Sequence, residues 1–263
     1  MREKRNLSEV IANRSITDSL SVLRCSFPHA AATAKPGQFV NVLPKIGFSD
    51  PMLRRPFSIY NVIGDEIEII IQRHGRGTDI LAGTNVGDVI DVLGPLGSPW
   101  QFDSNDYKTA LLLIGGVGVA SMPLLTKHLQ KESIPFFSYY GARSANMFAD
   151  EYLANVVYAT DDGSKGFIGT IIDKLRNDLK EGALYLPKLF VCGPTPMMKA
   201  AMALSEEFNI PCEVSLETEM ACGIGICQGC PVPTTETEAT KSGKKFYLVC
   251  TQGPSFTKES IIL

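Results

Sequence analysis

The chain lacks any hydrophobic run long enough to cross a bilayer. Its longest apolar stretch, Ala110–Ile114, is far shorter than the ~20 residues that a membrane helix needs. No apolar segment follows the charged start of the chain, so we expect no membrane span, no secretory signal and a cytoplasmic protein. The formal net charge is only −3 and the sequence has no basic stripe, so nucleic acid is excluded as an expected partner.

The length predicts more than one folded unit, because single cores tend to split beyond ~250 residues and this chain has 263. Residues 1–103 contain short β segments between Pro, Gly and Asp turns, with one short helical candidate at Thr78–Ala82. The expected strands are Ser19–Phe27, Gly37–Pro44, Phe57–Val62, Glu66–His74 and Val89–Leu93. This pattern predicts an antiparallel β barrel.

From residue 104 to residue 213, apolar strands alternate with amphipathic helices. The expected pairs are Ala110–Ile114 with Ala120–Gln130, Phe136–Tyr140 with Ala145–Leu153, Val156–Ala159 with Gly169–Leu179, and Leu189–Cys192 with Pro196–Phe208. Such alternation predicts an α/β domain with a parallel sheet and helices on both faces. The polar segment Gln101–Tyr107 marks the junction with the barrel, and Pro211–Leu216 is expected to add one more strand.

Residues 214–263 are rich in glycine and cysteine and have no helical period, which predicts a small third domain. Its polar stretch Pro233–Lys245 predicts an exposed hairpin loop.

Four of the seven cysteines lie in this third domain, spaced Cys222-x4-Cys227-x2-Cys230 with Cys250 further along the chain. Plant-type ferredoxins hold a [2Fe–2S] cluster through four thiolates with this spacing. Intervening glycines give the backbone the freedom to wrap around a cluster. A structural zinc site is the alternative, although zinc more often uses two short paired cysteine knuckles.

Two further segments are candidates for binding a dinucleotide. In the barrel, Arg54-Arg55-Pro56-Phe57-Ser58 begins a strand, and Gly75-Arg76-Gly77-Thr78 opens a short helix. An arginine can clamp a pyrophosphate, and backbone N–H groups at a helix start can bind phosphate. Each piece alone is weak, because an arginine-rich strand end is more often solvated and Gly-x-Gly is common in turns.

In the second domain, a buried strand runs into the turn Gly115-Gly116-Val117-Gly118, and another precedes Cys192-Gly193-Pro194. The first could place a pyrophosphate on a helix start, although a packing turn is at least as probable from spacing alone. Cys192 is expected to be a neutral thiol beside the site or simply a core residue, since none of the three histidines stands near it to activate a nucleophile.

These motifs together resemble the ferredoxin–NADP reductase superfamily, whose flavin motif has the form Arg-x-Tyr/Phe-Ser. Arg55, Pro56, Phe57 and Ser58 match it. The resemblance implies FAD in the barrel, with Ser58 near flavin N5, and NAD(H) as substrate beside Gly115, Gly116, Gly118, Cys192, Gly193 and Pro194. It also implies that FAD is contacted by Ile70, Ile71, Gln72, Gly77 and Thr78.

Module order and the cysteine segment are similar to the electron-transfer subunits of class 1B dihydroorotate dehydrogenases. That resemblance implies electron transfer between NAD(H), FAD, a [2Fe–2S] cluster and the FMN of a separate catalytic subunit in pyrimidine biosynthesis, in a heterotetramer of two of each. Two departures are the 19-residue spacer between Cys230 and Cys250 and the position of Pro123, which relatives usually carry directly after the alanine. The alternatives are an equivalent subunit of a ferredoxin, hydrogenase or sulfide dehydrogenase complex, or a non-catalytic zinc-stabilised adaptor.

The nucleotide preference follows from charge near the second and third strands of this domain. Arg143 and Ser144 could serve either ribose, whereas Asp161 and Asp162 disfavour a 2′-phosphate. We therefore expect NADH to be preferred to NADPH.

We predict one FAD and two iron atoms per purified chain, measured by absorbance and metal analysis. Cys222→Ser or Cys227→Ser should abolish the cluster while FAD remains, because the flavin motif lies in another domain. Stoichiometric zinc without iron would contradict the cluster assignment.

Overall fold

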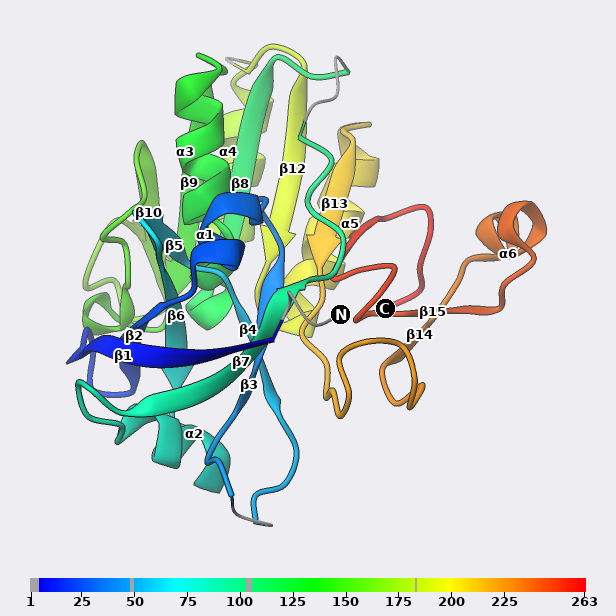
Figure 1. The fold of residues 1–263 in the computed structure, drawn as a ribbon. Coiled ribbons are helices and arrows are strands. Elements are labelled where there is room, and N and C mark those ends of the chain that lie inside the picture. Colours follow the sequence, from blue (N-terminus) through cyan, green and yellow to red (C-terminus); the bar gives the residue numbers. More distant parts are fainter. Residues whose placement is uncertain (1–4, 48–49, 103–105, 183) are drawn as a thin grey trace.

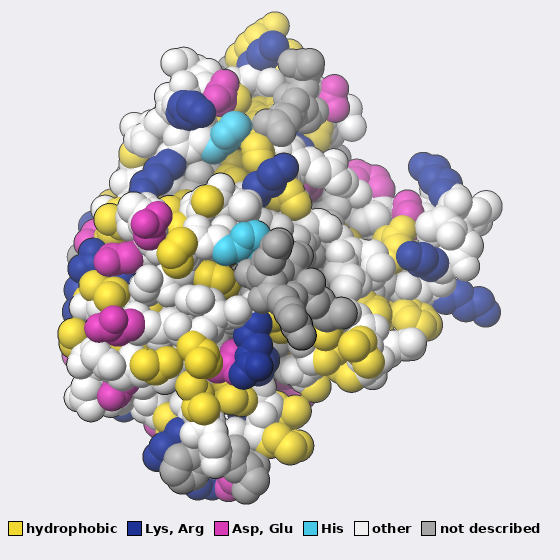
Figure 2. Space-filling view, viewed as in Figure 1, with side chains coloured by type: hydrophobic (Ala, Val, Ile, Leu, Met, Phe, Trp, Pro, Cys, Tyr) yellow, Lys and Arg dark blue, Asp and Glu magenta, His cyan; other side chains and the backbone are white. Residues whose placement is uncertain are grey.

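The computed structural model describes residues 5–47, 50–102, 106–182 and 184–263. Two seven-stranded sheets lie next to each other, and a small C-terminal segment with a two-stranded ribbon projects beyond them (Figure 1). Acidic and basic side chains are interspersed over the face in Figure 2. Among the helices of these ranges, none is long and apolar enough to span a bilayer.

The first sheet is antiparallel, in the order β4-β3-β7-β1-β2-β6-β5. Its strands are β1 (Arg5–Ser15), β2 (Leu20–Ser26), β3 (Phe39–Leu43), β4 (Arg55–Ser58), β5 (Asn61–Ile63), β6 (Glu66–Gln72) and β7 (Val89–Leu96), with helices α1 (Pro28–Thr33) and α2 (Arg76–Ala82). The chain itself links the two edges, because β4 runs through Ile59 and Tyr60 into β5. The N–H of Ile59 donates to the Gln38 carbonyl and that of Tyr60 to the Glu68 carbonyl. The expected barrel is confirmed.

Two elements of the barrel were not expected from the sequence. Strand β1 has no clean apolar alternation, and it is held by pairing with β2 on one side and β7 on the other. Helix α1 begins at Pro28, whose fixed φ suits a first helical turn, and it buries Ala30 against the barrel core.

The second sheet has the order β11-β10-β9-β8-β12-β13-β16 and is parallel except for β16. Its strands are β8 (Thr109–Gly115), β9 (Phe136–Ala142), β10 (Val156–Thr160), β11 (Phe167–Ile168), β12 (Pro187–Cys192), β13 (Cys212–Ser215) and β16 (Ser255–Thr257). Its helices are η2 (Gly116–Ser121), α3 (Pro123–Lys131), η3 (Ala145–Met147), α4 (Ile171–Lys180) and α5 (Thr195–Glu207).

Strand β8 shows why this sheet is covered on both faces. Leu111 and Leu113 pack in the core formed with α4 and α5, whereas Leu112 and Ile114 pack with α3. Successive side chains of a strand point to opposite faces, so a continuous apolar run requires two covered faces. The expected α/β domain is confirmed.

The expected helix at Ala145–Leu153 is wrong. Only Ala145–Met147 forms a 3₁₀ turn, and Phe148, the residue after it, has an extended backbone. The ring of Phe148 makes edge-on contacts with Tyr140 and Tyr158, and Asp150 accepts a hydrogen bond from the Tyr158 hydroxyl at 2.5 Å. These tertiary contacts outweigh the local helical preference.

The C-terminal segment contains β14 (Pro231–Pro233), α6 (Glu236–Ser242) and β15 (Phe246–Leu248). β14 and β15 form the predicted hairpin, but its polar connection contains α6, which was not expected. Thr235 caps the start of α6 through its hydroxyl, and Gly243 ends it in the left-handed region at φ +70°. Strand β16 then pairs with β13, within which the proposed division at residue 213 falls. The other proposed division, at residue 103, lies outside the described residues.

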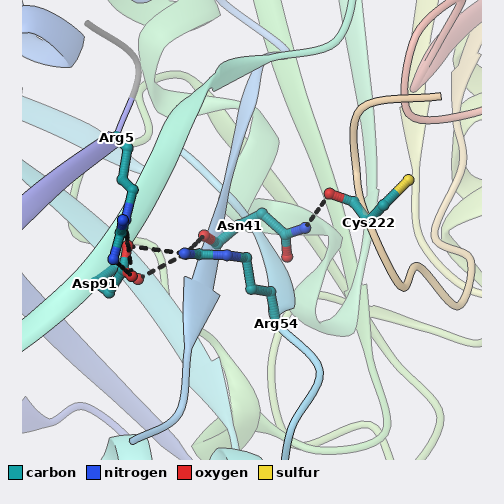
Figure 3. Close-up of polar contacts among 5 residues, drawn as sticks. All are labelled: Arg5, Asn41, Arg54, Asp91 and Cys222. Carbon is teal, nitrogen blue, oxygen red and sulfur yellow. Dashed lines mark hydrogen bonds and ion pairs between the residues drawn. The ribbon is translucent and has the colours of Figure 1, made fainter. Parts of the chain in front are cut away.

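A buried carboxylate connects three segments of the barrel (Figure 3). Asp91 of β7 is 2% exposed and accepts hydrogen bonds from Arg5 of β1, the shortest at 2.7 Å. It also pairs with Arg54, just before β4, at 2.8 Å. Burial alone would raise the pKa of Asp91, but the two guanidinium groups reverse this effect and lower it. The charged carboxylate is thus required for this junction.

We predict that Asp91→Ala lowers the free energy of unfolding by about 2–4 kcal/mol at pH 7, because it leaves two arginines without their buried partner. Because the folded pKa is depressed, the contribution of Asp91 is present at neutral pH and is lost as pH falls below about 4. Denaturant titrations of the wild type and the variant at pH 7 and below pH 4 measure the difference in the free energy of unfolding. Glu151→Ala, which removes the exposed pair with Arg14, is the control and should cost less than ~1 kcal/mol. Equal effects of the two substitutions would contradict the prediction.

Candidate cofactor sites

The two dinucleotide motifs meet where the sheets touch. Strands β4 and β6 of the barrel both contact η2, the glycine turn that follows β8. The candidate flavin strand and the candidate nicotinamide turn therefore belong to one continuous region of the molecule.

Arg55 and Gly77 come together in the barrel. The guanidinium of Arg55 lies so near the start of α2 that a Cβ added to Gly77 would be 3.1 Å from Arg55 Nε. Within the described residues its Nη1 donates to the carbonyls of Leu53 and Arg54. Arg55, Pro56, Phe57 and Ser58 are all partly accessible on β4. A cationic group beside a glycine-lined helix start suits a pyrophosphate.

The other predicted flavin contacts differ in what they can offer. The side chains of Ile70 and Ile71 are buried in two different cores, so only their backbone could reach a cofactor. Gln72 is exposed and points into the large cavity described below. The hydroxyl of Thr78 accepts from the N–H of His74 and donates to the Gly75 carbonyl, so Thr78 shapes the turn before α2.

A cavity of about 1010 Å³ lies at the carboxyl end of the parallel sheet. Of the predicted nucleotide residues, Gly115, Gly116, Gly193 and Pro194 line it, and Gln72 joins them from the barrel. A Cβ on Gly115 would be 2.6 Å from the sulfur of Met197, so the absence of a side chain lets the end of β8 pack closely against Met197. Carboxyl ends of parallel strands are where such sheets bind ligands.

Gly118 and Cys192 form the support behind this cavity. A Cβ on Gly118 would be 2.3 Å from the Cys192 carbonyl oxygen, so the glycine permits close packing of the turn on β12. Cys192 is buried, and loss of water raises the pKa of its thiol to about 12. It is therefore neutral at physiological pH, which is the form expected for a residue that packs rather than attacks.

Charged side chains in the cavity wall include three that the sequence analysis did not single out, namely Asp173, Arg176 and Glu217. Arg143, Asp161, Asp173 and Arg176 line the cavity together with Glu217. Part of the surface of Glu217 is exposed to the cavity. The protein around its carboxylate nevertheless excludes enough water to raise the pKa of this group. The only sign of this role in the sequence is that Glu217 comes directly after an expected strand and before the cysteine loop.

The four cysteines of the third domain gather as two neighbouring pairs. Cys222 Sγ interacts with the Cys227 thiol and accepts the N–H of Cys227 at 3.4 Å. Cys230 and Cys250 pair likewise, with the N–H of Cys250 at 3.5 Å from Cys230 Sγ. Within the described ranges, no three His, Cys, Asp or Glu side chains converge as they would around a single metal ion.

This pairing matches the way in which a [2Fe–2S] cluster would take its thiolates. A [2Fe–2S] cluster takes its four thiolates as two on each iron, whereas tetrahedral zinc needs four donors around one centre. Burial raises the pKa of Cys222, but the N–H groups of Cys227 and Ile224 more than offset this and lower it to about 7. Backbone N–H groups aimed at sulfur in this way stabilise thiolate ligands.

We predict that Asp161→Asn lowers the ratio of kcat/KM for NADH to that for NADPH by about tenfold, because it removes a carboxylate that repels a 2′-phosphate in the cavity. Steady-state reduction of a dye by each nucleotide measures this. Asp162→Asn is the matched control, because the Asp162 carboxylate instead accepts hydrogen bonds from Ser164. An unchanged ratio in Asp161→Asn would refute the assignment, as would a wild-type preference for NADPH.

Known proteins resemble the whole chain. A family model described as the iron–sulfur cluster binding domain of dihydroorotate dehydrogenase B matches residues 217–262. The protein named "Dihydroorotate dehydrogenase B (NAD(+)), electron transfer subunit" of Geobacillus kaustophilus is 35% identical, covering 97% of each chain. The protein of the same name from Clostridium acetobutylicum is 31% identical, covering 100% of this chain and 99% of the other.

Solved structures agree on the fold. The structure of an NADH-dependent reduced ferredoxin–NADP oxidoreductase matches with a TM-score of 0.85 and 26% identity, covering 98% of this chain and 90% of the other. A ferredoxin NADP⁺ reductase from Neisseria gonorrhoeae, with FAD and NADP bound, matches with a TM-score of 0.67 and 18% identity, covering 78% and 92%.

The expected ferredoxin reductase fold, iron–sulfur domain and oxidoreductase class are thereby confirmed. The chain belongs to the family of electron transfer subunits of dihydroorotate dehydrogenase B, components of NAD-dependent oxidoreductases.

Proposed function

We propose that this chain carries electrons between NAD(H) and a separate dihydroorotate dehydrogenase subunit that contains FMN and interconverts dihydroorotate and orotate. The observation that carries the proposal is the pairing of four thiols on a loop packed against the flavin-type barrel. When bound, FAD would accept electrons as hydride and a [2Fe–2S] cluster would carry them singly. The chain's own residues bind and orient these groups.

In this proposal Arg55 and the start of α2 at Gly77 hold the FAD pyrophosphate, with Ser58 beside the flavin ring. The cavity lined by Gly115, Gly193 and Gln72 receives the nicotinamide end of NAD(H). Its glycines leave the backbone without side chains there and so permit close approach of the ligand. The neutral Cys192 supports that end of the cavity.

Cys222, Cys227, Cys230 and Cys250 are the proposed cluster ligands. Cys227 is exposed, and the neighbouring side chain of Ile226 is 73% exposed, whereas Met220 and Ile224 pack on the core. One side of the loop therefore faces solvent, where a partner could receive electrons. We propose a heterotetramer of two such chains and two catalytic subunits.

We assign the complex to the cytoplasm and to pyrimidine biosynthesis. None of the seven cysteines is in a disulfide bond, which fits a reducing compartment.

A second candidate is the equivalent subunit of another NADH-dependent complex. The observation that supports this candidate is the likeness to the NADH-dependent ferredoxin–NADP oxidoreductase, at a TM-score of 0.85. Identification of the protein that copurifies with this chain separates the two.

We predict that the isolated chain oxidises NADH with artificial dyes yet has no activity towards dihydroorotate. Coexpression with the FMN-containing subunit should give a stable complex in which dihydroorotate reduces NAD⁺. Cys230→Ser should block this reaction while dye reduction by NADH survives, because only the path through the cluster is broken. Paired assays of the two activities measure this.

The control is Cys25→Ser, the same substitution of a buried cysteine in the barrel core, which should retain both activities. Turnover of dihydroorotate by the isolated chain would refute the proposed division of labour, as would NAD⁺-linked activity that is unaffected by Cys230→Ser.

A further inference from the structure

Asn41 lies in β3 directly beside the candidate flavin strand. In the ladder between β3 and β4 it faces Pro56, which has no N–H to donate. The carbonyl oxygen of Asn41 instead accepts a hydrogen bond from Arg54 Nη1 at 3.1 Å, and the same nitrogen donates to the Asp91 carbonyl. The backbone of Asn41 is therefore fixed to the segment that carries the Arg55–Ser58 motif.

The side chain of Asn41 points the other way, towards the cysteine loop (Figure 3). Its Nδ2 donates to the carbonyl oxygen of Cys222 at 3.3 Å. The next residue, Gly223, has φ +69°, and a Cβ there would be 2.4 Å from Asn41 Nδ2. The loop thus approaches β3 so closely that the backbone beside the first cysteine rests on this amide.

The buried amide of Asn41 has a cost in stability. Asn41 is completely buried, and its Oδ1 has no hydrogen-bond partner within the described residues. A buried acceptor without a partner destabilises the fold, and an apolar side chain of similar volume would avoid that cost. What the amide provides in return is the hydrogen bond from its Nδ2 to the Cys222 carbonyl, which no apolar side chain could make.

We propose that Asn41 is a positioning residue that holds the cluster loop against the flavin-binding strand and so fixes the relative placement of FAD and the [2Fe–2S] cluster. One side chain meets both elements, because its backbone is in the ladder with Pro56 and its amide is bonded to Cys222. Transfer of an electron between two centres slows steeply as they separate or reorient. Loosening this contact should therefore slow that transfer without removing either cofactor. This inference rests on the proposed function.

The test is Asn41→Leu in the full chain, which removes the donor and keeps the volume. Rapid mixing with NADH separates reduction of the flavin from the later reduction of the cluster, which is followed by absorbance and freeze-quench EPR. We expect flavin reduction to stay within about threefold of wild type, cluster reduction to slow at least tenfold, and the EPR line shape of the reduced cluster to change. Loss of iron with retention of FAD would overturn the proposal, because Asn41 would then be needed to retain the cluster rather than to place it relative to FAD.

Asn13→Leu is the matched control, because Asn13 also bonds backbone carbonyls of the barrel, at Ala82 and Thr84, away from the cysteine loop. It should leave the cluster signal and the transfer rate unchanged. If Asn41→Leu does not fold, Gly223→Ala tests the same contact from the loop, because the added methyl group displaces the Asn41 amide. It should slow the transfer in the same way.

Cluster reduction at the wild-type rate with an unchanged EPR line shape, in Asn41→Leu or in Gly223→Ala, would overturn the proposal. Failure of the proposed function is a separate result, since the wild-type chain would then lack FAD or iron before any variant is made.

Discussion

The buried carboxylate of Asp91 fixes the junction on which the candidate sites depend. A charge removed from water must be compensated, and Arg5 and Arg54 provide that compensation from two different segments. Arg54 then holds the carbonyl of Asn41, whose amide reaches the cysteine loop. A chain of contacts thus runs from the buried charge in the barrel to a loop that lies more than a hundred residues away in sequence.

Close backbone packing gives the rest of the site its shape. Gly118 lets the turn after β8 pack on the backbone at Cys192, and Gly115 lets the end of β8 pack closely against Met197. Strands β4 and β6 contact that same turn, so the candidate flavin strand and the nucleotide cavity share a wall. The two candidate sites therefore adjoin, which is what hydride transfer between them would require.

The pairing of the thiols adds something that cysteine spacing leaves open. Spacing alone is compatible with iron–sulfur and with zinc, whereas the pairing of Cys222 with Cys227 and of Cys230 with Cys250 matches the way in which a [2Fe–2S] cluster would take its thiolates. Strand β16, which follows Cys250, then joins the parallel sheet beside β13. The cysteine loop is therefore anchored at its far end to the nucleotide domain and at Cys222 to the barrel.

By itself, the sequence determined the elements whose signal is local. The apolar run at Ala110–Ile114, the alternation of strands and helices, the Arg55–Ser58 motif and the cysteine spacing each predict a feature that a few neighbouring residues encode. Only the tertiary structure decided the rest, because the forces involved act between distant segments. Strand β1 exists through its two partners, the expected helix at Ala145–Leu153 gives way to aromatic contacts, and Glu217 enters the cavity because β13 ends beside it. The position of Asn41 between the flavin motif and the cysteine loop is of the same kind, since no local pattern relates residue 41 to residue 222.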